Sequence, residues 1–191
     1  MSKRKKQTTS QNPIAFIAVG IGLIAVGVAA INLLAPRSSQ TQGAAESSVV
    51  PVAVNYPAPS VTLKDLEGNS NTLSDHRDQV VLVNMWATWC PPCVAELPTL
   101  NAFYKDHSGD GFVIIGIDDG EAQDVVQSFV TQKGLTFPIW LDPSYLSESA
   151  FKTMNLPSSF LIDRQGQVRL QWVGGISRAM LDKYVVPIIN E

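Results

Sequence analysis

Two cysteines, Cys90 and Cys93, follow an apolar run directly, and this pair limits the fold more than any other feature of the chain. The run Val80–Met85 has the length and composition of a buried strand, so the cysteines lie where a strand ends and a helix begins. A helix N-terminus favours negative charge, and a thiolate is the form of cysteine that attacks a disulfide. The pattern predicts a redox-active Cys90–Cys93 disulfide in which Cys90 is the nucleophile and Cys93 resolves the mixed disulfide.

Two structural roles for the pair compete with this redox role. A structural zinc site needs four ligands. The chain has 2 cysteines in all, and its 2 histidines, His76 and His107, are far from them in sequence. A permanent disulfide across so short a loop restricts the unfolded chain very little. We therefore favour redox chemistry, and we expect no metal site and no resident cofactor.

Pro91 and Pro92 separate the two cysteines. Neither proline has a backbone N–H, so neither can donate a hydrogen bond to a thiolate on Cys90, although both suit the first turn of a helix. A less stabilised thiolate makes the reduced pair a better electron donor. The two prolines therefore favour a reductant over an oxidant.

Acidic residues near the pair have two interpretations each. Glu96 follows Cys93 by one helical turn, so it either handles the Cys93 proton or complements the positive end of a helix. Asp118 and Asp119 end an apolar run, where they either bind a ligand or form an ordinary polar turn.

The segment Asn84–Cys93, with Glu96 and Pro98 after it, resembles the thioredoxin superfamily and more narrowly its membrane-anchored TlpA/ResA/CcmG-like thiol–disulfide oxidoreductases. A second block, Leu156–Asp163 followed by Gly166, carries the same resemblance, which extends over Ala58–Ile189.

The resemblance implies that Pro157 is a cis-proline beside the cysteines and that the backbone of Leu156 pairs with substrate. We expect Trp89, as an apolar cover, and Pro92 to contact the substrate as well. Asn84 stands where cytosolic thioredoxins have a buried aspartate, which leaves Glu96 as the proton carrier.

Strands and helices alternate along the chain, which indicates an α/β layer fold. We expect a thioredoxin-like fold, a central mixed sheet flanked by helices, with an extra α/β insertion over Glu121–Asp142. The expected strands are Val61–Leu63, Val80–Met85, Phe112–Ile117, Thr136–Leu141, Phe160–Asp163 and Val168–Val173. The expected helices are Cys93–Lys105, Ala122–Lys133, Tyr145–Met154 and Ser177–Ile189.

The N-terminal part predicts a membrane anchor before this domain. Ile14–Ala35 carries no charge and is long enough to cross a bilayer as a helix, although small residues near its end leave signal-peptide cleavage open. Four basic residues precede the run, so the N-terminus is expected in the cytoplasm and the rest outside it. We expect a basic tail over 1–12, a transmembrane helix over 13–36, a flexible linker over 37–57 and a thioredoxin-like domain over 58–191.

Charge excludes one class of partner. The chain has 14 basic and 17 acidic residues, and four of the basic ones precede the anchor, so a nucleic-acid partner is not expected. The resemblance implies client proteins with disulfides, such as an apocytochrome c or a copper-centre subunit of an oxidase. It also implies a membrane transporter that supplies electrons.

Two other activities compete with the reductase. A thiol peroxidase of related fold resembles Pro-x-x-x-Thr-x-x-Cys, whereas Thr88 precedes Cys90 by only two residues. A copper-delivery protein would use both thiols with a distant histidine, but no histidine follows His107.

Overall fold

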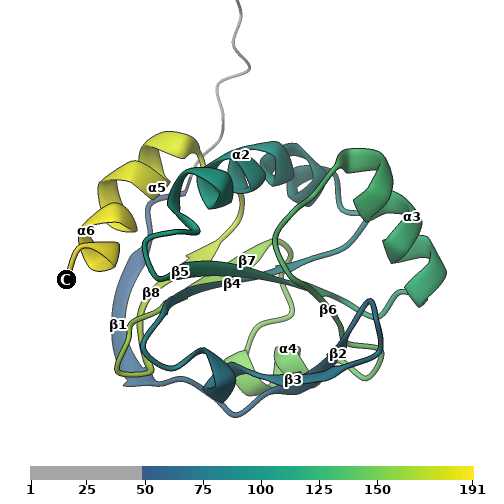
Figure 1. The fold of residues 1–191 in the computed structure, drawn as a ribbon, viewed down its shortest axis with the longest axis horizontal. Helices are drawn as coiled ribbons and strands as arrows, with labels where there is room; N and C mark the ends of the chain where they lie inside the picture. Colours follow the sequence, from purple (N-terminus) through teal and green to yellow (C-terminus); the bar gives the residue numbers. More distant parts are fainter. Residues whose placement is uncertain (1–48) are drawn as a thin grey trace, which may run out of the picture. The chain divides into compact units, whose positions relative to one another are not determined.

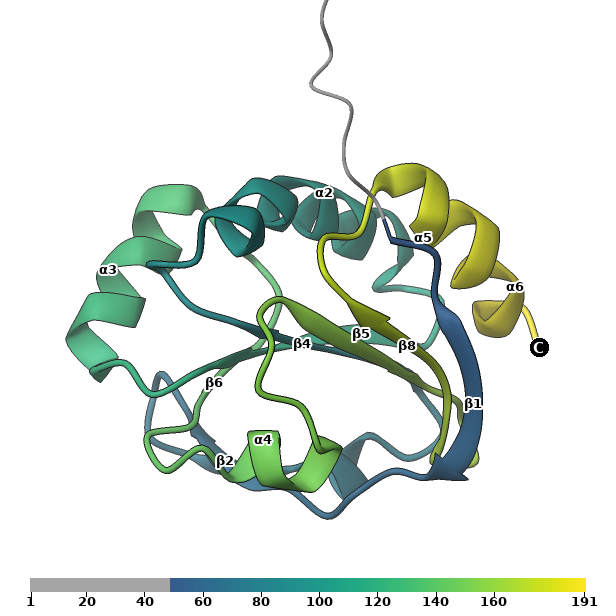
Figure 2. The same cartoon turned by 180° about the vertical axis from the view of Figure 1, so that it is seen from behind.

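The computed structural model describes residues 49–191, which form an eight-stranded mixed sheet with the strand order β1-β8-β7-β4-β5-β6-β2-β3. Helices α2, α3, α5 and α6 cover one face of this sheet, and α4 lies on the other (Figures 1 and 2). The expected thioredoxin-like α/β fold is confirmed. The predicted tail, anchor and first part of the linker lie outside the described residues, and no helix within 49–191 is long and apolar enough to span a bilayer.

The elements have the following bounds. The strands are β1 Val52–Pro57, β2 Thr62–Asp65, β3 Ser70–Thr72, β4 Val80–Trp86, β5 Phe112–Asp118, β6 Ile139–Leu141, β7 Ser158–Ile162 and β8 Gln167–Val173. The helices are the 3-10 turn η1 Leu73–His76, α2 Pro91–His107, α3 Gln123–Lys133, α4 Leu146–Phe151, α5 Arg178–Tyr184 and α6 Val186–Ile189.

Strand β4 lies at the centre of the sheet and leads directly into the cysteine pair. It runs parallel to β5 and antiparallel to β7, and all seven of its residues are buried. Side chains alternate along a strand, so Leu82 and Trp86 join the core cluster that contains both cysteines. Val83 and Met85 join the core cluster on the opposite face. Burial on both faces explains why the strand reads as a continuous apolar run.

The expected insertion and the C-terminal hairpin are present. Helix α3 and strand β6 follow β5, and β6 extends the sheet by pairing parallel to β5. Strands β7 and β8 pair antiparallel across a turn that contains Gly166, whose φ is +77°. A left-handed backbone at that position favours glycine.

The main differences from the expected elements lie near the two ends of the domain. Val52–Pro57, placed in the flexible linker, forms strand β1, which pairs antiparallel with β8 at the edge of the sheet. The single last helix expected over Ser177–Ile189 is two helices, α5 and α6. Pro187 explains the break, since it cannot donate the hydrogen bond that would continue α5.

Candidate redox active site

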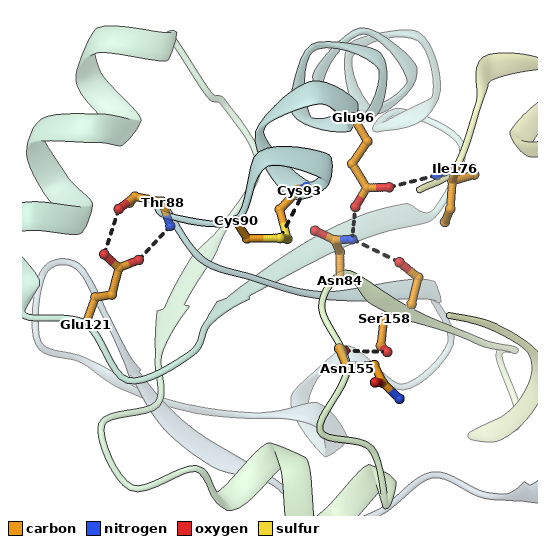
Figure 3. Close-up of a disulfide and its surroundings, with 10 residues drawn as sticks. Asn84, Thr88, Cys90, Cys93, Glu96, Glu121, Asn155, Ser158 and Ile176 are labelled. Carbon is orange, nitrogen blue, oxygen red and sulfur yellow. Dashed lines mark hydrogen bonds between the residues drawn. A yellow bond between two sulfur atoms is a disulfide. The ribbon is translucent and has the colours of Figure 1, made fainter. Parts of the chain in front are cut away.

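Cys90 and Cys93 form a disulfide at the start of α2, with their Cα atoms 5.3 Å apart (Figure 3). Cys90 is the N-cap residue, and its sulfur accepts a hydrogen bond from the backbone N–H of Cys93 at 3.3 Å. Only 4% of Cys90 is exposed, and Cys93 is fully buried. The predicted pair is therefore joined, and the residue predicted to be the nucleophile is the more exposed of the two.

The residues expected to contact substrate differ in exposure. Trp89 is 65% exposed beside the buried disulfide, and Pro92 is also exposed. The Leu156–Pro157 peptide bond is cis, as the resemblance implied, and Pro157 is buried. Leu156 is partly buried and packs against the core cluster that contains both cysteines. The substrate-binding role of these four residues stays a prediction.

Sheet register brings Pro157 to the end of the sheet that carries the cysteines. Met85 near the end of β4 pairs with Ser158 at the start of the antiparallel strand β7. Pro157 precedes Ser158, so it lies level with the segment that leads from β4 into Cys90. Its carbonyl oxygen accepts a hydrogen bond from Gly174 N at 2.8 Å, which fixes the turn after β8 at the same end.

Glu96 is buried beneath the first turns of α2, with only 5% of the residue exposed. Asn84 Nδ2 donates to Glu96 Oε1 at 2.8 Å, and the backbone N–H of Ile176 donates to Oε2 at 2.8 Å (Figure 3). Burial raises the pKa of Glu96 to about 7, although both hydrogen bonds act to lower it. A carboxyl of this kind can take up and release a proton near neutral pH.

A second carboxylate holds the turn that leads into Cys90. Glu121 accepts hydrogen bonds from the backbone N–H and the hydroxyl of Thr88, each at 2.6 Å (Figure 3). No motif in the sequence marks Glu121 as a site residue. Its position in the chain could have revealed it. Glu121 follows the end of β5, and because β5 runs parallel to β4, the carboxyl ends of both strands lie at the same edge of the sheet.

Asp118 and Asp119 form a structured turn at this edge. Asp118 is fully buried, and its Oδ1 accepts from Glu121 N at 3.0 Å. Burial raises the pKa of Asp118 to about 8; the hydrogen bond from the Glu121 backbone N–H opposes this rise, and the Glu121 carboxyl adds to it. Burial and then the carboxylates of Glu148 and Asp142 raise the pKa of Asp119 to about 6. The bond from Glu121 N fits the polar-turn interpretation, while Asp118 Oδ2 and Asp119 Oδ1 are buried without a hydrogen-bond partner.

The zinc interpretation of the cysteine pair has no support within residues 49–191. No group of three or more histidine, cysteine or acidic side chains there is arranged to hold a metal ion. Each histidine also has a local partner, since His76 bonds to Gln79 and His107 bonds to Asp110.

The chain is similar to known proteins that carry out thiol–disulfide exchange, which agrees with a disulfide at the start of α2. The AhpC/TSA family model matches residues 54–171. Thiol-disulfide oxidoreductase ResA of Geobacillus kaustophilus is 36% identical over 137 residues, which cover 72% of this chain and 79% of the relative. ResA of Halalkalibacterium halodurans is 31% identical over 185 residues, covering 97% of this chain and 96% of the relative.

A solved structure from Chlorobium tepidum, described as a thiol:disulfide interchange protein DsbE, is also similar. It superposes with a TM-score of 0.65 at 29% identity, covering 71% of this chain and 96% of that chain. The buried cysteine pair, the cis-proline and the sequence relatives lead to the same assignment. The chain belongs to the AhpC/TSA thioredoxin-like family, as a thiol-disulfide oxidoreductase of the ResA and DsbE type.

Proposed function

We propose that this oxidoreductase reduces disulfides in client proteins outside the cytoplasm and that Cys90 and Cys93 carry the electrons. The observation that carries the proposal is the disulfide at the N-terminus of α2, next to the buried carboxyl of Glu96. The disulfide also lies beside the exposed ring of Trp89, a surface that a client chain can contact.

The reaction proceeds by two thiol–disulfide exchanges. The Cys90 thiolate attacks one sulfur of the client disulfide, a Cys90–client bond forms, and the second client sulfur leaves and takes a proton from water. Cys93 then gives its proton to Glu96 and attacks the Cys90 sulfur. The Cys90–Cys93 disulfide forms, and the first client sulfur leaves as a thiolate that takes a proton from water, while Glu96 releases its proton to water. Two electrons have passed from the protein to the client, which now has two thiols.

Glu96 suits the second exchange because its pKa of about 7 leaves a large fraction of the carboxyl ionised at neutral pH. It shares a helix face with Cys93, the cysteine that must lose a proton. The oxidised pair is then reduced again by a membrane protein that carries thiol electrons.

The proposed direction of electron flow rests on the backbone around Cys90. Pro91 and Pro92 have no N–H, so Cys93 supplies the backbone donor to the Cys90 sulfur. Few donors to the thiolate favour a potential near that of thioredoxin, about −270 mV, over one near that of the oxidant DsbA, about −120 mV.

The proposed location rests on the sequence alone. The apolar run within 13–36 anchors the chain in the membrane, and the basic residues of 1–12 keep the N-terminus in the cytoplasm. The family resemblance supports an apocytochrome c as client, whose haem-binding cysteines must be reduced before haem attaches. The names of the relatives favour thiol–disulfide exchange over copper delivery and peroxide reduction.

A trapping experiment tests the proposal. In Cys93→Ser the first exchange still occurs but the second cannot, so a mixed disulfide between Cys90 and the client accumulates. We expect adducts in intact cells, and an adduct in vitro with an oxidised peptide that contains Cys-x-x-Cys-His. The matched variant Cys90→Ser lacks the nucleophile and should give no adduct. Absence of any adduct with Cys93→Ser, in cells and with the peptide, would contradict the proposal.

A further inference from the structure

The carboxamide of Asn84 is held rigidly but has one hydrogen-bonding atom without a partner. Its nitrogen donates to Glu96 Oε1 at 2.8 Å and to Ser159 Oγ at 2.9 Å, which uses both N–H groups. The ionised Glu96 carboxylate only accepts hydrogen bonds, so the nitrogen end of the amide faces it in that state. The oxygen end, Oδ1, is buried and accepts no hydrogen bond. A buried acceptor without a donor is costly and calls for an explanation.

This oxygen faces the cysteine pair. Asn84 is two residues after Leu82 and two before Trp86, so all three point to the face of β4 whose core cluster contains Cys90 and Cys93. Glu96, bonded to the nitrogen end, lies one helical turn after Cys93 on the same side of α2. Figure 3 shows Asn84 Oδ1 pointing toward the disulfide and the nitrogen turned toward Glu96.

Reduction of the disulfide creates the donor that Oδ1 lacks. In the disulfide neither sulfur carries a hydrogen atom, so neither can donate. Two electrons and two protons convert the bond into two thiols. Cys90 receives the backbone N–H of Cys93 at 3.3 Å, a bond that favours the thiolate. Cys93 is fully buried and so retains its proton, because burial disfavours the charged form.

We propose that in the reduced protein the Cys93 thiol donates a hydrogen bond to Asn84 Oδ1, which makes Asn84 a positioning residue for the redox pair. One amide then joins the Cys93 thiol to Glu96, the proposed acceptor of its proton. The inference rests on the proposed function in that the pair must become reduced during turnover.

The bond stabilises the dithiol form relative to the disulfide, so its loss should change the redox equilibrium. In Asn84→Leu we expect the equilibrium constant with glutathione to shift about fivefold toward the disulfide, the effect of one lost hydrogen bond. Ser159→Ala is the matched control, because it removes a bond to the nitrogen and leaves Oδ1 in place. It should leave the equilibrium within about twofold of wild type. Equal shifts in both variants would overturn the inference.

Infrared spectroscopy tests the bond directly and without a client. The chain has 2 cysteines, so Cys90→Ala has a single thiol and one S–H stretching band. We expect that band at the lower frequency of a hydrogen-bonded thiol, and at the free-thiol frequency when Asn84→Leu is added. A band at the free-thiol frequency in Cys90→Ala itself, or one that Asn84→Leu does not move, would overturn the inference. Neither result would bear on client reduction, which the trapping experiment tests.

A third measurement needs no substitution. The carboxamide carbon of Asn84 should change its NMR chemical shift when the wild-type disulfide is reduced, because its oxygen gains a donor. The side-chain carboxamide carbon of Asn69, a turn residue bonded to Asp65, serves as an internal reference. An Asn84 carbon that responds no more than the Asn69 carbon would contradict the inference.

Discussion

At the scale of single residues, the site depends on carboxyl groups that the fold keeps away from water. Burial of Glu96 raises its pKa from 4.5 to about 7, so the folded protein holds this proton more tightly than the unfolded chain. The free energy of unfolding therefore falls as pH rises from about 4.5 to about 7, because the unfolded chain loses the proton first. A group that evolved only for stability would not impose this cost, which supports a functional role for Glu96.

The first prediction follows from that pH dependence. The side chain introduced by Glu96→Gln does not titrate. Between pH 4.5 and 7, the free energy of unfolding of the wild type should therefore fall by on the order of 3 kcal/mol more than that of the variant. Urea unfolding of the disulfide-bonded wild type and variant at several pH values measures this difference in the free energy of unfolding. Asp118 and Asp119, whose pKa values are also raised, add to the slope in both proteins, so the difference isolates Glu96. Parallel curves for wild type and variant would contradict the account.

Residue identity and spacing alone indicate the pair Cys90 and Cys93. The family resemblance is needed to favour Glu96 as the proton carrier and to single out Pro157. Glu121 was missed because its bond to Thr88 joins residues 33 positions apart. Only the parallel pairing of β4 and β5 brings these two residues together. The role of Asn84 was likewise invisible, since Asn84 in β4 meets Glu96 in α2 and Ser159 in β7 only in the folded protein.

At the scale of elements, the hydrophobic pattern of the sequence predicted the central strands of the sheet better than its edge strands. Strands β4 and β5 are apolar except for Asn84 and Asp118, and burial on both faces of the sheet favours that pattern. Strand β1 is mostly exposed, so its residues carry little of that signal. Strand β1 forms because it pairs with β8, which is distant in the sequence. The local pattern of Val52–Pro57 does not contain this contact, so the segment was predicted to be part of the linker.

The second prediction concerns this edge strand. A chain that starts at residue 58, the predicted start of the domain, should be less stable than a chain that starts at residue 49. Four residue pairs join β1 to β8, so the expected loss is on the order of 2 kcal/mol. Urea unfolding of the two proteins under the same oxidising conditions compares them. Equal midpoints and slopes would show that β1 contributes nothing to the fold.

At the scale of the whole molecule, topology gathers the site at one end of the sheet. The carboxyl ends of the parallel strands β4 and β5 meet there, which places the cysteine turn beside Glu121. The antiparallel strand β7 begins at the same end and brings Pro157 with it. Residues from three separate segments thus converge around one disulfide, and the central strands behind them are buried.

The most direct test of the central claim measures whether Cys90 and Cys93 form a reversible couple. The whole chain is equilibrated with thiol buffers of graded potential, alkylated and weighed by mass spectrometry. We predict that both thiols appear together in one two-electron transition, with a midpoint nearer about −270 mV than about −120 mV. If the number of alkylated thiols stayed the same at every potential, the pair would be structural and the account would be wrong.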